Sequence, residues 1–388
     1  MGMTETHSTA DTHVHSPTDP VEPAVSQFLS ELSTSGHLNG GGQFADSHTT
    51  ALATVNLLKR LIGQSKWHTA QELMGVIRAS GARLTATLES QVMVANLFRR
   101  TLKLVREEYA SALKGRQAED DPQESLHKMV EMAGQHEGLA DFGQPVPDLK
   151  TKVIESVDEL LMEMEAASEE IANQSLEHIH ANEIILTVGR SRTVELFLKQ
   201  AAQDRQFHVI VAECAPFYQG QAMAASLAQA PARIKTTVIT DTAVFAMMSR
   251  VNKVIIGTHV ILANGGLKAL SGSYTVALAA QHFSVPMYVC ASIAKLTPGF
   301  CTANDQETFN EFASPEATLR HLDGGILSRV RTVTPIYEYV PPDLVTLFVS
   351  NVSAYAPSYV YRLLSELYHP EDYDLSAPLP VKSNHSKI

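Results

Sequence analysis

The sequence predicts an α/β protein with an N-terminal helical bundle, followed by a Rossmann-like parallel α/β domain. In residues 21–180, apolar side chains recur every three or four positions, which is typical of amphipathic helices. From about residue 182, short β-branched runs alternate with helix-like segments, the pattern of a parallel sheet covered on both faces. We expect a helical domain over 21–180, an α/β domain over 181–375, and disordered tails at 1–20 and 376–388.

The bulk composition supports two globular domains and excludes several classes of protein. The 388 residues are 44% hydrophobic and 19% charged, which is enough apolar material for two cores. A net charge of -12 argues against a general nucleic-acid or membrane-surface binder. The three cysteines have no metal-ligand or disulfide spacing, and no targeting segment or apolar run of about 18 residues occurs. We expect a cytosolic protein without a membrane span, cofactor or metal.

Two apolar stripes predict the helical bundle. The first lies within Val92–Ala112, and the second recurs along residues 153–171. The second stripe comprises Val153, Val157, Leu160, Met164, Ala167 and Ile171. It implies one long helix with an acidic outer face, which needs neighbouring helices to cover its apolar side. Two breaks are expected, a flexible joint at Leu38–Gly42 and an exposed loop at Gly115–Pro122.

Short apolar runs predict the strands of the parallel sheet, and helix-like segments separate most of them. The expected strands are 184–187, 209–211, 237–240, 254–256 and 287–289. The expected helices between them are 193–202, 221–229, 242–249 and 273–282. Ligands of such sheets bind beyond the carboxyl ends of the strands, so we look for functional residues there.

The first strand end carries Gly189, Arg190 and Ser191. One interpretation is that Ser191 caps the next helix. The other is that the free N–H groups at the start of this helix, together with Arg190, bind a phosphate. Because no glycine-rich phosphate-binding motif is present, a plain strand-to-helix turn is the favoured interpretation.

Three further strand ends carry side chains that are able to perform acid–base or nucleophilic chemistry. Cys214 is either a nucleophile or a buried, inert thiol. Asp241 is either a general acid–base or the N-cap of the next helix, and His259 is either an acid–base or a structural histidine. His178 and His180 leave a helix in different directions at their spacing, so they do not predict a metal site.

Taken together, these strand ends resemble one superfamily. It contains the methylthioribose-1-phosphate and ribose-1,5-bisphosphate isomerases and the regulatory subunits of eukaryotic translation initiation factor 2B. The resemblance extends over about 180–350, in the stretches Thr237–Asp241, Val254–Thr258, Ile261–Gly265, Gly272–Tyr274 and Tyr339–Leu344. It implies an α/β domain of the isomerase-like superfamily.

The resemblance also implies that the isomerase site is no longer catalytic. The isomerases carry a cysteine in a pattern resembling L-T-H-C-N, and Gly189 stands at the matching position here. Their catalytic aspartate lies in a pattern resembling G-A-D-R, and His259 stands at that position. Asp241 matches a different aspartate of the frame, and Ala269 and Leu270 replace an Asn-Lys pair. Without a thiol or its carboxylate partner, we expect no isomerase activity.

Within this family the chain resembles the beta-type regulatory subunits, from about residue 25 to 375. The stretches that carry this resemblance are Arg99–Tyr109, Ser175–Glu183, Phe207–Phe217, Met248–Thr258, Ala356–Tyr359 and Ser365–Pro370. The resemblance implies partners: the alpha, gamma, delta and epsilon subunits of the exchange factor, in a decamer of two sets of five. It also implies that initiation factor 2, including its phosphorylated alpha subunit, is bound as substrate, and that the epsilon subunit with gamma performs the exchange.

Two surfaces are expected from this resemblance. Asn182 and His208, just before the first and second strands, are expected near the interface with the delta subunit. The equal alternative is that both residues simply flank the strands and have no role at an interface. Arg99, Lys103 and Arg106 form a basic stripe on one helix face, either a contact for the substrate's alpha subunit or a solvated face paired with Glu107.

Two other functions stay open at this point. A divergent sugar-phosphate isomerase would use Cys214 in place of the missing thiol. A binding-only sensor would hold a sugar phosphate or a nucleotide at the strand ends.

Overall fold

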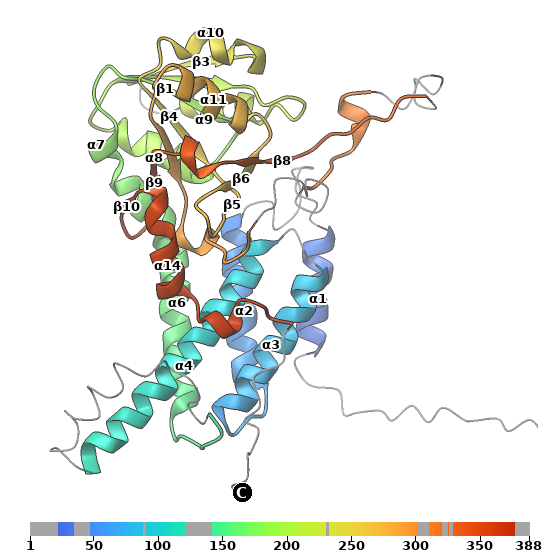
Figure 1. The fold of residues 1–388 in the computed structure, drawn as a ribbon, viewed down its shortest axis with the longest axis vertical. Helices are drawn as coiled ribbons and strands as arrows, with labels where there is room; N and C mark the ends of the chain where they lie inside the picture. Colours follow the sequence, from blue (N-terminus) through green and yellow to red (C-terminus); the bar gives the residue numbers. More distant parts are fainter. Residues whose placement is uncertain are drawn as a thin grey trace, which may run out of the picture.

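The computed structural model describes residues 22–34, 47–87, 91–120, 142–229, 233–300, 310–319, 325 and 329–376. A helical bundle comes first in the chain, and an α/β domain lies against its upper end in Figure 1. The expected joint at 38–42, residues 1–20 and 377–388 of the expected tails, and residues 121–141 lie outside the described residues.

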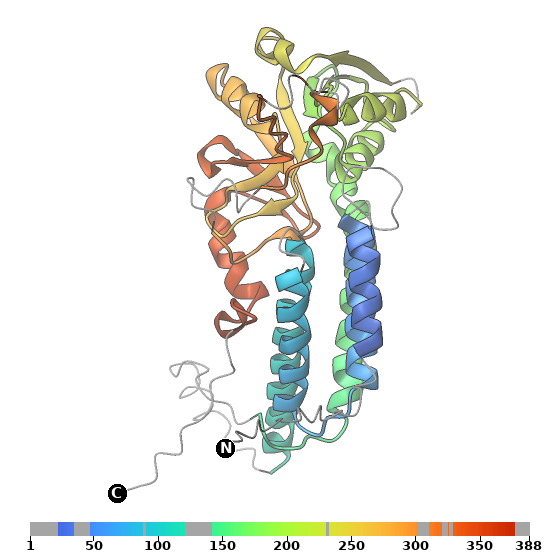
Figure 2. The same ribbon diagram turned by 90° about the vertical axis from the view of Figure 1, so that its right-hand side faces the viewer.

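The bundle is built from α1 (Glu22–Thr34), α2 (Ser47–Gln64), α3 (Ala70–Thr87), α4 (Val92–Asp120) and α6 (Leu149–Asn173). The connections from α2 to α3 and from α3 to α4 are short, which makes these neighbours antiparallel, and Figure 2 shows the helices side by side. The short α7 (Ser175–His178) then leads into the sheet. None of the described helices is long and apolar enough to cross a membrane.

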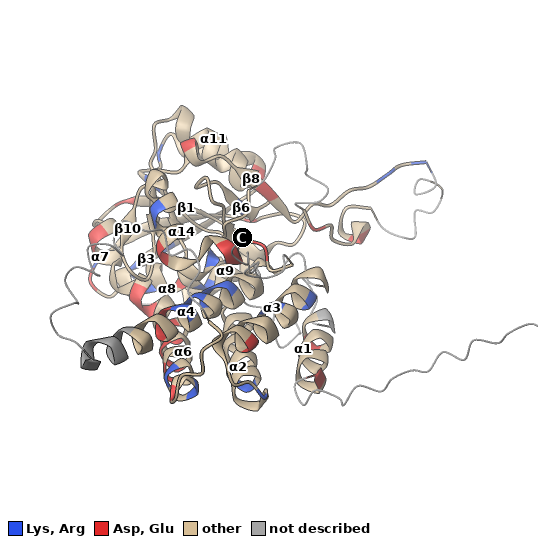
Figure 3. Ribbon diagram, turned by 60° about the horizontal axis from the view of Figure 1, so that its bottom comes forward, with Lys and Arg blue, Asp and Glu red and all other residues tan. Residues whose placement is uncertain are grey.

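Both predicted apolar stripes are confirmed. The stripe on α6 is buried along its whole length, and Figure 3 shows acidic positions elsewhere on that helix. On α4, the stripe is buried at Val94, Leu97, Phe98, Leu102 and Val105. The two stripes meet in one core cluster, so the bundle has its own hydrophobic core.

The loop predicted at Gly115–Pro122 is wrong as far as Asp120, because α4 continues to that residue. The residues after Gly115 are Arg116, Gln117, Ala118 and Glu119, all good helix formers. A single glycine costs a helix only about 1 kcal/mol relative to alanine, so these neighbours outweigh it.

The main sheet has seven strands in the order β10-β9-β7-β4-β1-β2-β3. They are β1 (Ile184–Val188), β2 (Phe207–Ala212), β3 (Ile234–Ile239), β4 (Lys253–Gly257), β7 (Met287–Cys290), β9 (Leu347–Val349) and β10 (Ala354–Tyr355). Its neighbours are parallel except β9 and β10, and the five predicted strands are confirmed. The chain order reverses between β1 and β4, where Rossmann-type sheets open a crevice.

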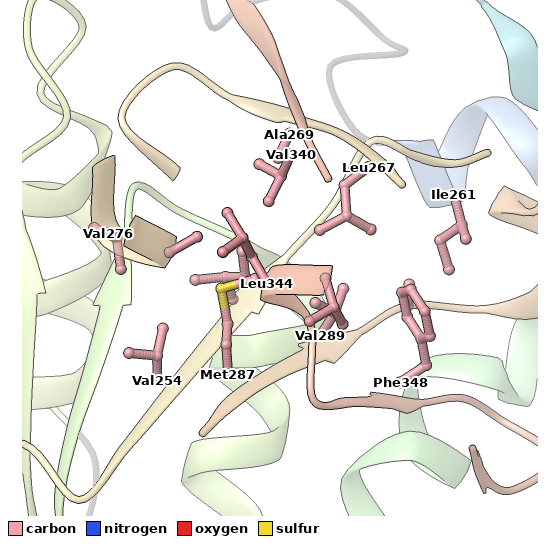
Figure 4. Close-up of a cluster of buried hydrophobic side chains, with 14 of the residues drawn as sticks. Val254, Ile261, Leu267, Ala269, Val276, Met287, Val289, Val340, Leu344 and Phe348 are labelled. Carbon is pink, nitrogen blue, oxygen red and sulfur yellow. The ribbon is translucent and has the colours of Figure 1, made fainter. Parts of the chain in front are cut away.

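Helices cover both faces of this sheet, as predicted. On one face, α8 (Arg192–Ala201) and α9 (Gln219–Ala228) pack over one core cluster. On the other, α10 (Val244–Met248), α11 (Ser273–His282) and α14 (Val360–Leu367) cover a second cluster. Figure 4 shows this second cluster, in which Val254, Met287 and Val289 of the sheet lie close to Val276 of α11.

A second, three-stranded antiparallel sheet was not predicted. It pairs β5 (Val260–Ile261) with β6 (Leu267–Leu270), and β6 with β8 (Tyr337–Val340). The turn between β5 and β6 contains Gly265 at a φ of +80°, and the N–H of Gly266 donates to the Asn264 side chain at 2.9 Å. The Asn264–Gly265 pair therefore forms the tip of a hairpin. Short 3₁₀ turns complete the domain: η1 (Asp241–Ala243), η2 (Ile293–Lys295), η3 (Pro315–Ala317), η4 (Pro342–Leu344), η5 (Pro357–Tyr359) and η6 (Pro370–Asp372).

Residues 368–376, which we call the C-terminal strap, return from α14 to the bundle (Figure 1). Asp372 is 0% exposed and accepts hydrogen bonds from Arg78 Nη1 at 2.7 Å and from Arg106 Nε at 3.0 Å. Leu375 is buried in the bundle core, where its Cδ1 would lie 3.3 Å from a Cβ added to Gly81. A buried carboxylate between two guanidinium groups therefore attaches the end of the α/β domain to α3 and α4.

Replacing Asp372 with Asn leaves Arg78 and Arg106 buried without their shared carboxylate. Removing one partner of a buried ion pair destabilises a protein by about 3–5 kcal/mol, so we expect a loss of that size in the free energy of unfolding, measured by urea denaturation. Glu366→Gln is the control, because its pair with Arg362 is exposed and screened by solvent, so its loss should change the free energy of unfolding little. A loss for Asp372→Asn no larger than that of the control would contradict this assignment.

Candidate functional site

A pocket of about 180 Å³ opens at the carboxyl ends of β1 and β4, where the strand order reverses. Its walls come from the loops after these strands, from β6 and β8, and from the bundle. The lining residues include Ser47, Thr50, Gln91, Val188, Arg190, Ser191, Arg192, Gly257, His259, Leu270, Lys295 and Tyr337. The structure thus brings three predicted residues, Arg190, Ser191 and His259, into one pocket, whereas Cys214 and Asp241 do not line it.

Gly189 lies between two lining residues, Val188 and Arg190, and a side chain there would have to displace Leu270. Its φ is +61°, in the left-handed region that favours glycine. A Cβ placed there would lie 2.9 Å from Leu270 Cδ1 and 3.6 Å from Cys214 Sγ. Leu270, which stands where the resemblance places an isomerase lysine, therefore occupies the space in front of Gly189.

Ser191 serves the strand-to-helix turn, as the favoured interpretation has it. It is the N-cap of α8, and its side chain accepts a hydrogen bond from the N–H of Val194 at 3.5 Å. A Cβ added to Gly257 would lie 2.4 Å from Ser191 Oγ, so the serine packs against the end of β4. Arg190 is half-exposed and pairs with Glu195 at 3.4 Å.

Cys214 is a buried thiol. Its side chain is 4% exposed, and Sγ lies 3.7 Å from the carbonyl oxygen of Ser271. Burial first, and then the carboxylates of Asp241 and Glu338, raise the pKa of the Cys214 thiol to about 12. The inert alternative therefore describes this cysteine, and its thiol is protonated at neutral pH.

Asp241 does not cap the next helix, so the N-cap interpretation is wrong, and it does not line the pocket. One carboxylate oxygen accepts the backbone N–H of Cys214 at 2.9 Å, and the other accepts that of Ala215 at 2.7 Å. The N-cap of the following 3₁₀ turn is Thr240. Asp241 fixes the turn after β2, because its carboxylate satisfies two backbone donors there.

His259 is part of an aromatic stack on the pocket wall. Its ring lies 4.6 Å from that of Tyr337 with 19° between their planes, and Lys268 Nζ lies 5.0 Å from the same tyrosine ring. The backbone N–H of His259 donates to the carbonyl of Lys268 at 3.0 Å. The structural alternative accounts for the position of His259, because stacking and backbone pairing both hold it in place.

Sequence reasoning missed several pocket residues. Lys295 donates to the carbonyl of Thr258 at 2.9 Å, and Arg192 and Tyr337 line the same space. Ser47 and Gln91 reach the pocket from the bundle. These residues come from separate segments of the chain, and nothing in their local sequence marks them as neighbours. The described residues contain no cluster of three or more His, Cys, Asp or Glu side chains able to hold a metal ion.

Asn182 and His208 lie at the opposite, amino-terminal ends of the strands. Asn182 has a φ of +64°, and its N–H donates to the carbonyl of Gln206 at 2.7 Å. His208 lies within β2 rather than before it, with Nε2 2.8 Å from Thr237 Oγ1. Burial, and then Lys235, lower the pKa of His208, so its ring is neutral at pH 7. Their place near a subunit seam stays a prediction.

The basic stripe is covered by the C-terminal strap, so it is neither an open contact for a partner nor a simply solvated face. Arg106 is buried against Asp372 and Glu371, and Arg99 Nε donates to the carbonyl of Tyr373 at 3.1 Å. Lys103 donates to the carbonyl of Glu366 at the end of α14 and pairs with Glu107 at 3.5 Å. The helical spacing identified one face correctly but gave no information about what covers it.

The fold and the pocket together define an isomerase-like α/β protein with an N-terminal helical bundle. The chain belongs to the initiation factor 2 subunit family, whose sequence profile matches residues 43–357. It is 40% identical to translation initiation factor eIF2B subunit beta of Dictyostelium discoideum, over 84% of this chain and 92% of the relative. Identity to the Schizosaccharomyces pombe protein of the same name is 37%, over 90% and 97%. These relatives confirm the resemblance to beta-type subunits.

Solved structures agree with this assignment. The crystal structure of eIF2B beta from Chaetomium thermophilum matches with a TM-score of 0.69 and 25% identity, covering 91% of this chain and 94% of that chain. A chain of the tetrameric eIF2B-beta2-delta2 complex from C. thermophilum gives 0.65 at 24% identity, over 90% and 95%. The 5-methylthioribose 1-phosphate isomerase from Pyrococcus horikoshii gives 0.55 at 18% identity, over 88% and 87%, which shows a shared fold.

The raised pKa of Cys214 predicts an unreactive thiol in the folded protein. With a pKa of about 12, only about one thiol in 10⁴ is ionised at pH 8, and burial also blocks reagents. In a Cys301→Ser background, a thiol reagent at pH 8 should label Cys214 only after denaturation, as followed by peptide mass spectrometry. Denatured protein provides the control, and labelling of native Cys214 within minutes would contradict the assignment.

Proposed function

We propose that this chain is a regulatory, non-catalytic subunit of the initiation factor 2B exchange factor. In this role it scaffolds the complex in the cytosol and helps to sense phosphorylation of the alpha subunit of initiation factor 2. The observation that carries the proposal is the 40% and 37% identity to two eIF2B beta subunits, over 84% and 90% of this chain. Gly189 and His259, which stand where the resemblance places the two catalytic groups of the isomerases, support it. The exchange activity then belongs to the epsilon subunit, together with gamma.

The geometry argues against a surviving isomerase activity. Gly189 has no side chain, Leu270 occupies the space in front of it, and His259 is held in a stack with Tyr337. A positioned acid or base typically contributes 10² to 10⁴-fold, so losing both groups removes most of the catalysis. Cys214 does not replace the missing thiol, because it is buried and protonated.

An apolar face on α10 and α11 suits a subunit interface. Phe245, Tyr274 and Leu278 are exposed there, and the Phe245 ring lies 5.1 Å from the rings of both His282 and Phe283. Exposed aromatic and leucine side chains that gather on one face mark protein interaction sites. We assign this pairing face to a delta-type subunit, and the beta2-delta2 complex among the structural neighbours supports that choice.

His208 projects from the same side of the sheet as this pairing face. Side chains alternate along a strand, so His208 shares its side with Ile210 and Ala212. Both of those residues belong to the core cluster that α10 and α11 cover. This position supports the proposal that His208, with the nearby Asn182, lies close to the seam with the delta subunit.

The proposed role predicts which subunit combinations release GDP from initiation factor 2. A complex of this chain with its partner subunits should accelerate release only when the epsilon subunit is present, because the chain has no exchange machinery of its own. Release is followed with a fluorescent GDP analogue, and a complex that lacks only this chain is the matched control. GDP release by this chain alone would contradict the proposal.

A second candidate function is the binding of a small phosphate-bearing molecule in the pocket. Arg190, Arg192 and Lys295 line it together with hydroxyl groups, which suits an anion. Its volume of about 180 Å³ is below the roughly 300–1,000 Å³ of ordinary ligand pockets, so the ligand would be small.

Calorimetry with inorganic phosphate and small sugar phosphates tests this second candidate. We expect saturable binding that Arg192→Ala weakens at least tenfold, since the guanidinium is a direct anion partner. Arg250→Ala is the matched control, because this arginine is exposed and does not line the pocket, and it should leave binding unchanged. The absence of saturable heat across the panel would exclude this function.

A further inference from the structure

Residues 310–319 and 329–336 form an arm that projects from the body of the protein. Figure 1 shows its two limbs extending away from the bundle and from the sheets beyond β8, and Figure 3 shows the same from another direction. The limbs pair with each other: the N–H of Ala313 donates to the carbonyl of Thr334, and that of Ile336 to the carbonyl of Glu311, both at 2.9 Å. The arm is therefore a two-stranded ribbon that lies outside both domain cores.

The arm exposes apolar side chains that its own fold does not cover. Phe312, Val330 and Val333 are 49%, 50% and 49% exposed, respectively. Arg329 and Arg331 flank Val330 and are also exposed. An isolated two-stranded ribbon is at best marginally stable in water, and contiguous exposed apolar groups usually mark an interaction site.

The base of the arm is rigid, which suits a preformed contact. The N–H of Tyr337 donates to Asn310 Oδ1 at 2.9 Å, so the two limbs are joined where β8 begins. The same tyrosine stacks on His259 in the pocket wall. Because the arm is anchored in this way, less conformational freedom is lost when it binds a partner.

The arm begins beside the pairing face of α10 and α11. The N–H of Tyr274, the first exposed aromatic residue of α11, donates to the carboxylate of Glu338 in β8. A partner chain that covers Tyr274 and Leu278 is therefore within reach of the limb at 329–336, which leads into β8. Continuity between these surfaces favours the subunit bound to the pairing face as the partner of the arm.

We propose that the arm reaches over the delta-type subunit and buries Phe312, Val330 and Val333 in an apolar groove of that subunit. The groove should carry acidic groups beside Arg329 and Arg331. This inference rests on the proposed function, because it takes the delta-type subunit as the chain bound to α10 and α11.

The test measures binding of the full-length chain to the purified delta-type subunit. Val330→Asp/Val333→Asp should raise the dissociation constant at least about tenfold, because charges would enter an apolar contact. Ala317→Asp/Thr318→Asp is the matched control, since it adds the same charge at exposed positions elsewhere on the arm. Leu278→Asp on the pairing face should weaken binding as well.

A photo-crosslinking residue at position 312 of the otherwise unchanged chain gives an independent readout. The expected product is a crosslink to the delta-type subunit, whereas a crosslink to a second copy of this chain would overturn the proposal. Equal dissociation constants for the Val330→Asp/Val333→Asp variant and its control would overturn the proposed contact of the arm. They would not overturn pairing through the face that contains Leu278. Failure of the unchanged chain to bind the delta-type subunit would overturn both the arm and the pairing itself.

Discussion

The structure depends on one buried carboxylate, that of Asp372, held between the guanidinium groups of Arg78 and Arg106. Charges removed from water are tolerated only when they are paired, so the C-terminal strap has one favourable position on the bundle. That position orients the α/β domain relative to α3 and α4. The pocket is a consequence, because its walls include Ser47 and Gln91 of the bundle as well as the strand ends.

The positions that the resemblance matches to an isomerase site are held by packing and backbone contacts. Leu270 fills the space in front of Gly189, His259 stacks on Tyr337, and Asp241 satisfies the backbone of the turn after β2. Each side chain at a catalytic position, or beside one, therefore contributes to packing or to backbone pairing. Gly189→Cys would place a side chain against Leu270 in a left-handed backbone conformation, so a thiol at this position is disfavoured.

Local sequence patterns predict where the helices and strands lie, but they do not predict which of these elements contact one another. The stripe on α6 follows from the 3.6-residue period of a helix, and the five central strands follow from short apolar runs of a sheet that is covered on both faces. The sheet formed by β5, β6 and β8 joins short segments that lie far apart in the chain, so no local sequence pattern predicts it. Lys295 is likewise distant in sequence from the strand ends whose pocket it lines, so its own neighbours do not mark it as a pocket residue. The basic stripe on α4 shows the same limit: its spacing is correct, but its partner, Asp372, lies at the other end of the sequence.

Two exposed apolar surfaces, the face on α10 and α11 and the arm, bear on how this protein assembles. The apolar face on α10 and α11 and the uncovered arm suit this protein to assembly with other chains. The most direct measurement is native mass spectrometry of the complex captured through this chain at its natural abundance. The account predicts a mass that contains the delta-type subunit and the other subunits of the exchange factor. Recovery of the chain alone, or only as copies of itself, would contradict it.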